Sequence, residues 1–180
     1  MASTVLVRRE RPDDIDAIRR VHNAAFGTDA DTATVEARLV DDLRSGPSWI
    51  PALSLVAEVD GAVVGHVLAT RGRVDREASA PPIRVVGIAP VGVLPEVQHL
   101  RIGSSLMYAL LGAAQALGEE VACLLGSPAY YERFGFVISS TVGIAPPVPG
   151  WAPHFQALVF DAGRIDGGGT FHYDEAFDRM

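Results

Sequence analysis

The stretch LPEVQHLRIGSSLMYALL, residues 94–111, holds residues whose types and spacing suit the binding of an anion. A helix N-terminus presents unpaired amide groups and a partial positive charge, which together bind phosphate. Gly103 lets the backbone approach a ligand closely, and Ser104 and Ser105 offer hydroxyls to the helix start or to a phosphate. The alternative is that Gly103 simply begins a helix, and the loop by itself leaves both interpretations open.

Two common nucleotide-binding motifs are missing from this stretch. The nucleoside triphosphatase motif G-x-x-x-x-G-K-[ST] needs a lysine, and all 15 basic residues of the chain are arginine. The same lack of lysine excludes a Schiff-base mechanism. The segment VGVLPEVQHLRIGSS also lacks the G-x-G-x-x-G of dinucleotide-binding folds.

Composition excludes several other classes of function. The net charge is −7, which disfavours a general nucleic-acid binder. No apolar run is long enough for a membrane span, and MASTVLVRRERPDD is expected to hold the first strand, not a signal peptide. Cys123 is the only cysteine, so an internal disulfide and a cysteine metal cluster are excluded, and a reducing cytoplasm is the expected location.

Hydrophobic patterns predict a mixed α/β fold in one domain over residues 1–180. Helix 104–117 connects strands 83–93 and 121–125, which makes these two strands parallel neighbours. Gly87, Pro90 and Gly92 predict a bulge or a close backbone approach in strand 83–93. Residues 71–82 are expected to form a loop or a strand extension, and residues 143–154 to be irregular. The other expected strands are 4–8, 53–59, 62–70, 136–139, 156–160 and 170–173, and the other helices are 12–25, 31–44 and 129–134.

The loop and its flanks resemble a known family. VGVLPEVQHLRIGSSLM is similar to the acetyl-CoA-binding motif of the GNAT superfamily of N-acetyltransferases, an apolar strand and V-x-P followed by Q/R-x-x-G-x-G/A at a helix start. Gln98, Ile102 and Gly103 match that motif, whereas Arg101 stands at its first glycine and His99 at another frequent glycine. LSLVAEVDGAVVGHV, SPAYYERFGF and FQAL extend the resemblance, in order, to the YhbS-like branch of bacterial acetyltransferases.

The resemblance implies a mostly antiparallel central sheet flanked by helices, with a splayed strand pair that forms a coenzyme groove. Pantetheine would bind to the backbone of Val91, Gly92 and Val93 like an extra strand, and the Val93 amide would hold the thioester carbonyl and its oxyanion. The pyrophosphate would lie over the backbone amides of the loop and helix start, which are those of His99, Leu100, Arg101, Ile102, Gly103 and Ser104.

The resemblance also assigns a general acid. Tyr131 matches the family tyrosine that protonates the departing coenzyme thiolate, after direct attack of a neutral amine on the thioester. The alternative is that Tyr130 and Tyr131 are both core aromatics, and we favour Tyr131 as functional and Tyr130 as packing. Glu132 and Arg133 are expected on a solvated surface.

The general base is left open by the sequence. His66, Glu36 and Glu96 are candidates, each with a structural or surface role as the alternative, and a chain of waters is another. Cys123 is expected to be buried and inert. No metal is predicted, because the spacing of the remaining histidines does not suit a metal site, namely His22, His99, His154 and His172.

Arg101 supports two interpretations. Its guanidinium would add charge beside the coenzyme phosphates, or its side chain would strain a loop position that needs φ > 0, at a cost of about 1–2 kcal/mol. Arg101, His99 and Ser127, which replaces a family Asp, favour a catalytically degenerate acyl-CoA-binding or regulatory module. Tyr131, Val93 and Gly103 favour an enzyme.

The acceptor is expected to be an amine of a small molecule or a protein. Its site would be built by the first two helices, the hairpin at Asp60–Gly61 and the segment around Trp151 and His154. The sequence does not define the length of the acyl chain. No nucleic-acid or membrane partner is expected, and a homodimer is compatible with the family.

Overall fold

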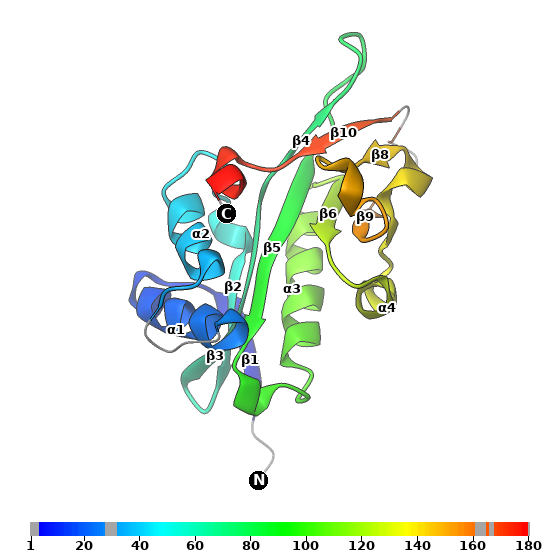
Figure 1. The fold of residues 1–180 in the computed structure, drawn as a ribbon. Coiled ribbons are helices and arrows are strands. Elements are labelled where there is room, and N and C mark those ends of the chain that lie inside the picture. The colour runs from blue at the N-terminus through cyan, green and yellow to red at the C-terminus, as the bar shows by residue number, and fades with distance from the viewer. Residues whose placement is uncertain (1–3, 28–31, 161–164, 166–167, 180) are drawn as a thin grey trace.

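The computed structural model describes residues 4–27, 32–160, 165 and 168–179, which form two sheets and four α-helices in the described parts of the chain (Figure 1). The main sheet has the strand order β1-β2-β3-β5-β6-β9-β7, and the smaller sheet has the order β4-β10-β8. The helices are α1 Ile15–Phe26, α2 Val35–Arg44, α3 Ile102–Ala116 and α4 Pro128–Tyr131. The strands are β1 Val5–Arg9, β2 Ser54–Val59, β3 Ala62–Arg71, β4 Arg73–Asp75, β5 Val85–Val93, β6 Val121–Leu125, β7 Val137–Ile138, β8 Ile144–Ala145, β9 Phe155–Val159 and β10 Gly169–His172.

The main sheet is mixed and mostly antiparallel, as the resemblance implies. β5 and β6 are its parallel pair, and the other paired neighbours run antiparallel. α3 connects β5 to β6 and packs against β3, β2 and β5. The prediction that strands 83–93 and 121–125 are parallel neighbours is therefore confirmed.

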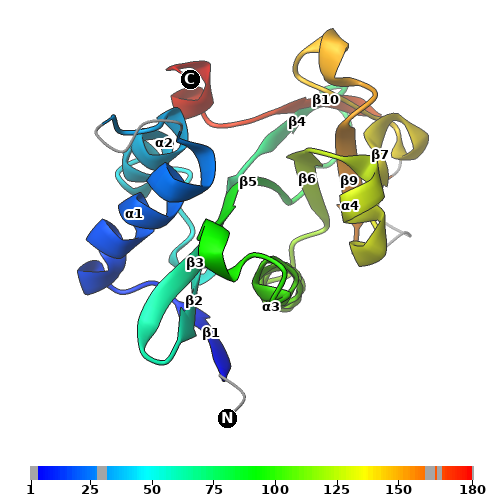
Figure 2. The ribbon, with the colours of Figure 1, turned by 60° about the horizontal axis from the view of Figure 1, so that its bottom comes forward.

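Helices cover both faces of the main sheet, with α1 and α2 on one face and α3 on the other (Figures 1 and 2). Successive strand residues point to opposite faces, so each strand contributes to two cores. Leu55 and Val67 pack in the α3 core with Leu106, whereas Val56 and Leu68 pack against α1 and α2. This alternation explains why the sheet strands are apolar along almost their whole length.

Several boundaries differ from the predicted ones for local reasons. α2 begins at Val35 because the Thr34 hydroxyl accepts a hydrogen bond from the Ala37 amide at 3.1 Å. Asp31, where that helix was expected to begin, lies outside the described residues. α3 begins at Ile102, two residues earlier than expected, directly after a left-handed residue. Residues 71–82, expected to form a loop or a strand extension, contain β4, and the expected irregular segment 143–154 contains β8, because both strands pair with β10.

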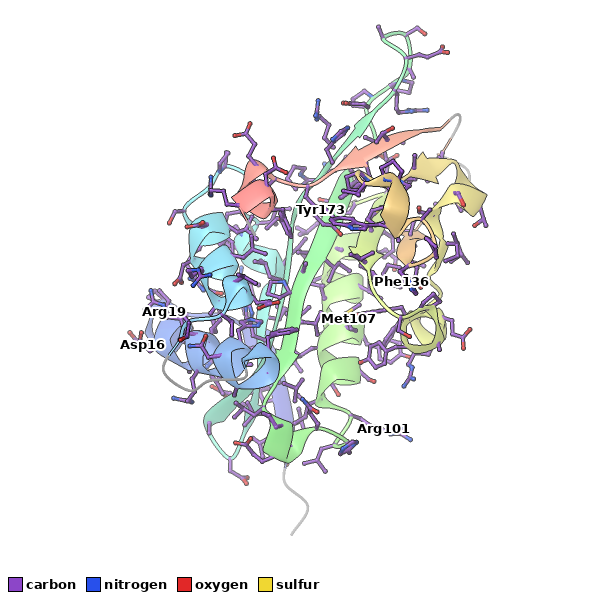
Figure 3. All side chains as sticks on the ribbon, in the orientation of Figure 1. Asp16, Arg19, Arg101, Met107, Phe136 and Tyr173 are labelled. Atoms are coloured by element: carbon purple, nitrogen blue, oxygen red, sulfur yellow. The ribbon has the colours of Figure 1, made fainter. Side chains whose placement is uncertain are left out.

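The C-terminal segment returns across the molecule to the helices of the N-terminal half. The Tyr173 ring lies directly over β5, because a Cβ added to Gly87 would lie 2.6 Å from Tyr173 Cε1 (Figure 3). Ala176 is buried in the core with α1 and α2, and Arg179 pairs with Asp42 at 3.3 Å. This segment therefore connects the β5 strand to the helices α1 and α2 on that face of the main sheet.

Candidate active site

β5 and β6 diverge in the middle of the sheet. They pair only from Val85 to Gly87, opposite Val121 to Cys123. Beyond that point β5 continues on β3 as far as Val93, while β6 continues on β9 as far as Leu125. The two strands are thus splayed toward their C-terminal ends, as the resemblance implies, and both leave one edge of their backbone unpaired there.

A bulge in β5 accompanies the divergence. Val67 of β3 lies opposite Val91 and Ala69 lies opposite Ile88, so Ala89 and Pro90 together face a single residue of β3. Pro90 has no amide hydrogen to contribute to either neighbouring strand. The prediction of a bulge in this strand is confirmed.

Beyond the bulge, the β5 backbone faces the gap at alternate residues. The Leu94 amide donates to Val64 O at 2.9 Å, so Leu94 faces β3. Because backbone groups of an antiparallel strand alternate between its two sides, Gly92 also faces β3, whereas Val91 and Val93 face the gap. Gln98 Nε2 donates to Val93 O at 3.1 Å from that side. The amide that we predict to hold the thioester carbonyl is thus directed into the gap.

A first cavity of about 480 Å³ lies between the end of β5, the start of α3 and α4. Most of the predicted coenzyme residues line it together with the predicted acid Tyr131. Gly92 and Leu100 do not: a Cβ on Gly92 would meet His22 on the opposite side of the strand, and Leu100 is 58% exposed. The predicted residues in the wall are Val91, Val93, Gln98, His99, Arg101, Ile102, Gly103, Ser104 and Tyr131.

The loop before α3 adopts the backbone that the glycines of the motif would favour. His99 has φ 77° and Arg101 has φ 59°, both in the left-handed region. Arg101 directly precedes α3, so the first amide groups of that helix, at Ile102, Gly103 and Ser104, have no acceptor within the helix. Arg101 also lines the cavity, and its side chain extends from the loop at the base of α3 (Figure 3). The left-handed backbone of the second interpretation is therefore present at Arg101, whereas a contact of its guanidinium with coenzyme phosphates stays a prediction.

The wall opposite α3 contains two residues that sequence reasoning had placed elsewhere, Tyr130 as packing and Arg133 on a solvated surface. A Cβ added to Gly103 would lie 3.1 Å from Tyr130 Oη, so the phenol reaches across to the start of α3. The Arg133 guanidinium lies 4.7 Å from the centroid of the Tyr130 ring, and its Nε donates to Tyr130 O at 2.8 Å. Arg133 is exposed, as expected, and it also lines the first cavity, which the sequence did not predict. The sequence signal for this contact was the spacing of Tyr130 and Arg133, three residues apart, which places them on one side of a helical turn.

The first cavity attracts anions, although the protein as a whole is acidic. Its wall includes Arg101 and Arg133 and no carboxylate among the described residues, whereas the net charge of the chain is −7. Field lines concentrate in a recess lined by one sign of charge. The free amides at the start of α3 add partial positive charge at the same place.

Tyr131 lies between the first cavity and a second one. Burial, together with Tyr130, raises the pKa of Tyr131 to about 12, so the phenol carries its proton at neutral pH. Gly126 makes room for the ring, because a Cβ there would lie 2.4 Å from Tyr131 Cε2. The neutral phenol can thus donate a proton to a group in either cavity.

The second cavity, of about 510 Å³, lies on the α1 and α2 side of β5 and shares Val91 and Tyr131 with the first. The first two helices and the segment around Trp151 contribute to it, as predicted for an acceptor site, whereas His154 and the Asp60–Gly61 turn do not. Sequence reasoning missed the C-terminal aromatic residues. The remaining wall residues are Phe26, Glu36, Leu39, Ile88, Ala89, Pro90, Leu125, Trp151, Tyr173 and Phe177.

His66, a candidate base, lines neither cavity and lies in a buried chain of polar groups. Ser54 Oγ donates to Glu10 Oε2, His66 Nε2 lies 2.9 Å from Ser54 Oγ, and His22 Nε2 lies 2.8 Å from His66 Nδ1. Burial alone would raise the pKa of Glu10, but hydrogen bonds from His66, Arg44 and Ser54 hold it at about 2. Both histidines are fully buried, and burial lowers the pKa of each.

The carboxylate of Glu10 fixes which atom donates and which accepts in each hydrogen bond of this buried series. Because a carboxylate only accepts, the Ser54 hydrogen points to it and Ser54 Oγ accepts from His66 Nε2. Neutral His66 then accepts at Nδ1 from His22 Nε2, which leaves His22 Nδ1 as an acceptor. That atom has no hydrogen-bond partner among the described residues and points at Gly92, whose added Cβ would lie 2.8 Å away. These hydrogen bonds thus connect α1, through His22, to β3 and β2 of the main sheet.

Two other residues considered for chemistry, Glu96 and Cys123, line neither cavity. Glu96 is exposed beside the loop, and Cys123 is fully buried, which raises the pKa of its thiol. Within the described ranges, no cluster of three or more His, Cys, Asp or Glu side chains is arranged to hold a metal ion. Among the helices that the structure describes, none is long and apolar enough to cross a membrane.

Comparison with known proteins defines the class of this site. Residues 6–139 match the family described as the acetyltransferase (GNAT) domain, and the chain belongs to this family of N-acetyltransferases. It is 31% identical over 178 residues to the uncharacterized N-acetyltransferase YhbS of Escherichia coli K12, a match that covers 98% of this chain and 100% of YhbS. It is 36% identical over 123 residues to the uncharacterized N-acetyltransferase YjhQ of the same strain, which covers 68% of this chain and 64% of YjhQ. Within the family, the chain is thus a relative of YhbS along nearly its whole length.

Two solved structures share the fold. The crystal structure of Escherichia coli YhbS in complex with CoA superimposes with a TM-score of 0.87 at 28% identity, over 100% of this chain and 95% of that one. A GNAT family acetyltransferase from Brucella melitensis in complex with acetyl-CoA superimposes with a TM-score of 0.77 at 32% identity, over 97% and 99%. The predicted family and fold class are confirmed.

Proposed function

We propose that this protein is one acetyl-CoA-dependent N-acetyltransferase domain over residues 1–180, and that it transfers an acetyl group to a primary amine by direct attack. The observation that carries the proposal is the pair of cavities that meet at Val91 and Tyr131. Coenzyme in the first cavity and an amine in the second would meet beside a neutral phenol. The CoA and acetyl-CoA complexes of the two relatives support the choice of coenzyme.

The coenzyme is proposed to lie along the gap between β5 and β6. Its pantetheine arm would pair with the backbone groups of Val91 and Val93 that face the gap. Its pyrophosphate would accept from the first amides of α3 and attract Arg101 and Arg133, which line the same cavity. Gly92 and Leu100 would then shape the strand and loop from behind. The donor set of this cavity suits a phosphate ester and does not suit a cation.

The reaction is proposed to run in one direct displacement. The neutral amine nitrogen forms a bond to the thioester carbon, and the carbonyl oxygen charge is stabilised by the Val93 amide. The carbon–sulfur bond then breaks, its electron pair goes to sulfur, and the Tyr131 phenol gives sulfur its proton. The proton lost by the amide nitrogen returns to the phenolate directly or through water. The products are the N-acetyl amine and the free thiol of coenzyme A.

A binding module without catalysis is the second candidate, and the loop favours it. His99 and Arg101 occupy left-handed positions at which a side chain costs free energy. The family motif has its first glycine at the position of Arg101 and often a glycine at that of His99. A chain that had lost its selection for coenzyme turnover would tolerate such replacements. We propose cytoplasmic action for either candidate, and a homodimer is compatible with both.

Thermal-shift titration with acetyl-CoA and a thiol-release assay separate the candidates. An enzyme gains stability with coenzyme and releases thiol when a suitable amine is added; a module gains stability and releases none. The Tyr131→Phe variant should keep coenzyme affinity and lose at least about 100-fold in turnover, the lower end of the range for loss of general acid catalysis. Tyr108→Phe is the matched control, because the Tyr108 phenol is exposed on α3 outside both cavities. Equal turnover of Tyr131→Phe and wild type would remove Tyr131 from the mechanism.

A further inference from the structure

The two cavities that meet at Tyr131 carry opposite charges. The first has two arginines and no carboxylate in its described wall, and the second has one carboxylate, Glu36, and no basic side chain. An acidic amine would therefore be repelled from the second cavity, and a cationic one would be attracted to it. This division of charge bears on which acceptor the protein uses.

Glu36 is held in place by the helix that carries it. It lies in the first turn of α2, whose start is fixed by the Thr34 cap and whose inner face is buried through Leu39, Val40 and Leu43. The Glu36 side chain is half-buried and has no ion-pair or hydrogen-bond partner among the described residues. A partly desolvated, unpaired carboxylate in a cavity wall favours a cation as its ligand.

Most of the remaining wall is aromatic or aliphatic. Phe26, Trp151, Tyr173 and Phe177 surround the space from α1, from the segment before β9 and from the C-terminal segment. The Tyr173 and Phe177 rings lie 4.4 Å apart, and Tyr173 rests on β5. Aromatic faces bind apolar groups and also attract cations. Such a wall offers little hydrogen bonding to a sugar, a polyol or a peptide backbone.

We propose that the acceptor is a small hydrophobic monoamine, an aryl- or branched alkylamine without an anionic group, and that Glu36 is its cation-binding specificity residue. The inference rests on the proposed function and adds the substrate class. The ammonium form enters toward Glu36 and its apolar body fills the aromatic wall. After loss of one proton to solvent, the same nitrogen attacks at the junction beside Val91 and Tyr131. Glu36 thus acts on acceptor binding and leaves coenzyme binding unchanged.

Initial rates of thiol release with four classes of amine test the substrate class. The probes are 2-phenylethylamine and tryptamine, spermidine, L-glutamate and a short lysine-containing peptide, each with saturating acetyl-CoA. We expect kcat/KM for the two aryl amines to exceed that of every other probe at least tenfold. A preference for the polyamine, the acidic amine or the peptide would overturn the inference and leave the proposed function standing. Thiol release with none of the probes, despite coenzyme binding, would refute the proposed function and the inference with it.

Two variants test the residues. Glu36→Gln should raise KM for 2-phenylethylamine by about 10–100-fold, the range expected when a hydrogen bond to a charged group is lost, with kcat and KM for acetyl-CoA within twofold of wild type. Glu77→Gln is the matched control, an exposed carboxylate in the β4–β5 connection outside both cavities, and should change nothing. Phe177→Ala should raise KM for tryptamine by a larger factor than KM for ethylamine. An unchanged KM in Glu36→Gln would exclude Glu36 from acceptor recognition.

Discussion

Replacement of Arg101 by Gly and by Ala separates the two effects of this residue, because the variants change the backbone and the charge differently. Both remove the guanidinium, but only glycine relieves the left-handed backbone at φ 59°. A side chain in this region costs about 1–2 kcal/mol, and glycine costs about 0.5–1 kcal/mol of extra chain entropy on folding. We therefore expect Arg101→Gly to be about 0.5–1 kcal/mol more stable than Arg101→Ala, measured as the free energy of unfolding in urea.

The same two variants should bind coenzyme A more weakly than wild type. A charge-assisted contact of an exposed arginine with phosphate is worth about 1 kcal/mol, which corresponds to a Kd raised about fivefold. Titration calorimetry at low and high ionic strength measures this, and the loss should shrink at high salt because exposed charges are screened. Arg20→Ala, which removes an exposed arginine on α1 away from the cavity, controls for the change in net charge.

Two results would refute this reasoning about Arg101. If Arg101→Gly and Arg101→Ala have equal free energies of unfolding, the backbone strain inferred from the positive φ is not stored in the loop. If Arg101→Ala binds coenzyme A as tightly as wild type at low ionic strength, the guanidinium does not contact the phosphates. The first result concerns only the backbone and the second only the side chain, so each interpretation can fail alone.

Three further variants or conditions test other parts of the site. Gly126→Ala should lower kcat at least tenfold, because its Cβ would lie 2.4 Å from the Tyr131 ring. Gly112→Ala on α3 is the control: its Cβ would have no atom within 4 Å, so it should leave kcat unchanged and add about 0.5–1 kcal/mol to the free energy of unfolding. Equal kcat in the two variants would contradict this expectation. Gly92→Ala should destabilise the fold by about 1–3 kcal/mol in urea, since overpacking against the buried His22 costs that much, and an unchanged midpoint would show that the ring moves freely. Burial keeps the pKa of His22 and His66 in the folded state below 6.5, so the unfolded state binds more protons below that pH. The free energy of unfolding should therefore fall as pH drops below about 6.5, by up to about 1.4 kcal/mol per pH unit for each histidine. A flat profile between pH 7 and pH 5 would refute the inferred neutral tautomers.

The sequence was informative where the site is built from neighbouring residues. The end of β5, the loop and the start of α3 follow one another, so a motif along the chain describes one wall of the first cavity, and its positive φ values fall at the positions where the motif has glycine. Apolar runs located the inner strands of the main sheet, such as β2, β3 and β5, because their side chains are buried on both faces. Predicted elements were least accurate where a short strand exists only through a distant partner, as for β4 and β8 on β10.

Residues that meet only through the tertiary fold escaped sequence reasoning. His22 and His66 are 44 residues apart and form one hydrogen bond, and neither residue has a local pattern that announces the other. Tyr173 and Phe177 reach the second cavity only because β10 pairs with β4 and directs the chain end over β5. Glu36 was named from the sequence only as a candidate base with a surface charge as the alternative, and its place in the wall of the second cavity became visible only in the fold.

The unequal origins of the two cavities have a consequence for descent within the family. The wall of the first cavity comes from residues 91–133, inside the segment 6–139 that matches the family, whereas Trp151, Tyr173 and Phe177 of the second cavity lie beyond that segment. Changes in the C-terminal third can therefore reshape the second cavity while the loop and α3 are inherited intact. Under the proposed assignment of the two cavities, such a lineage can exchange one acceptor for another without first losing its coenzyme, and relatives that share the loop need not share a substrate.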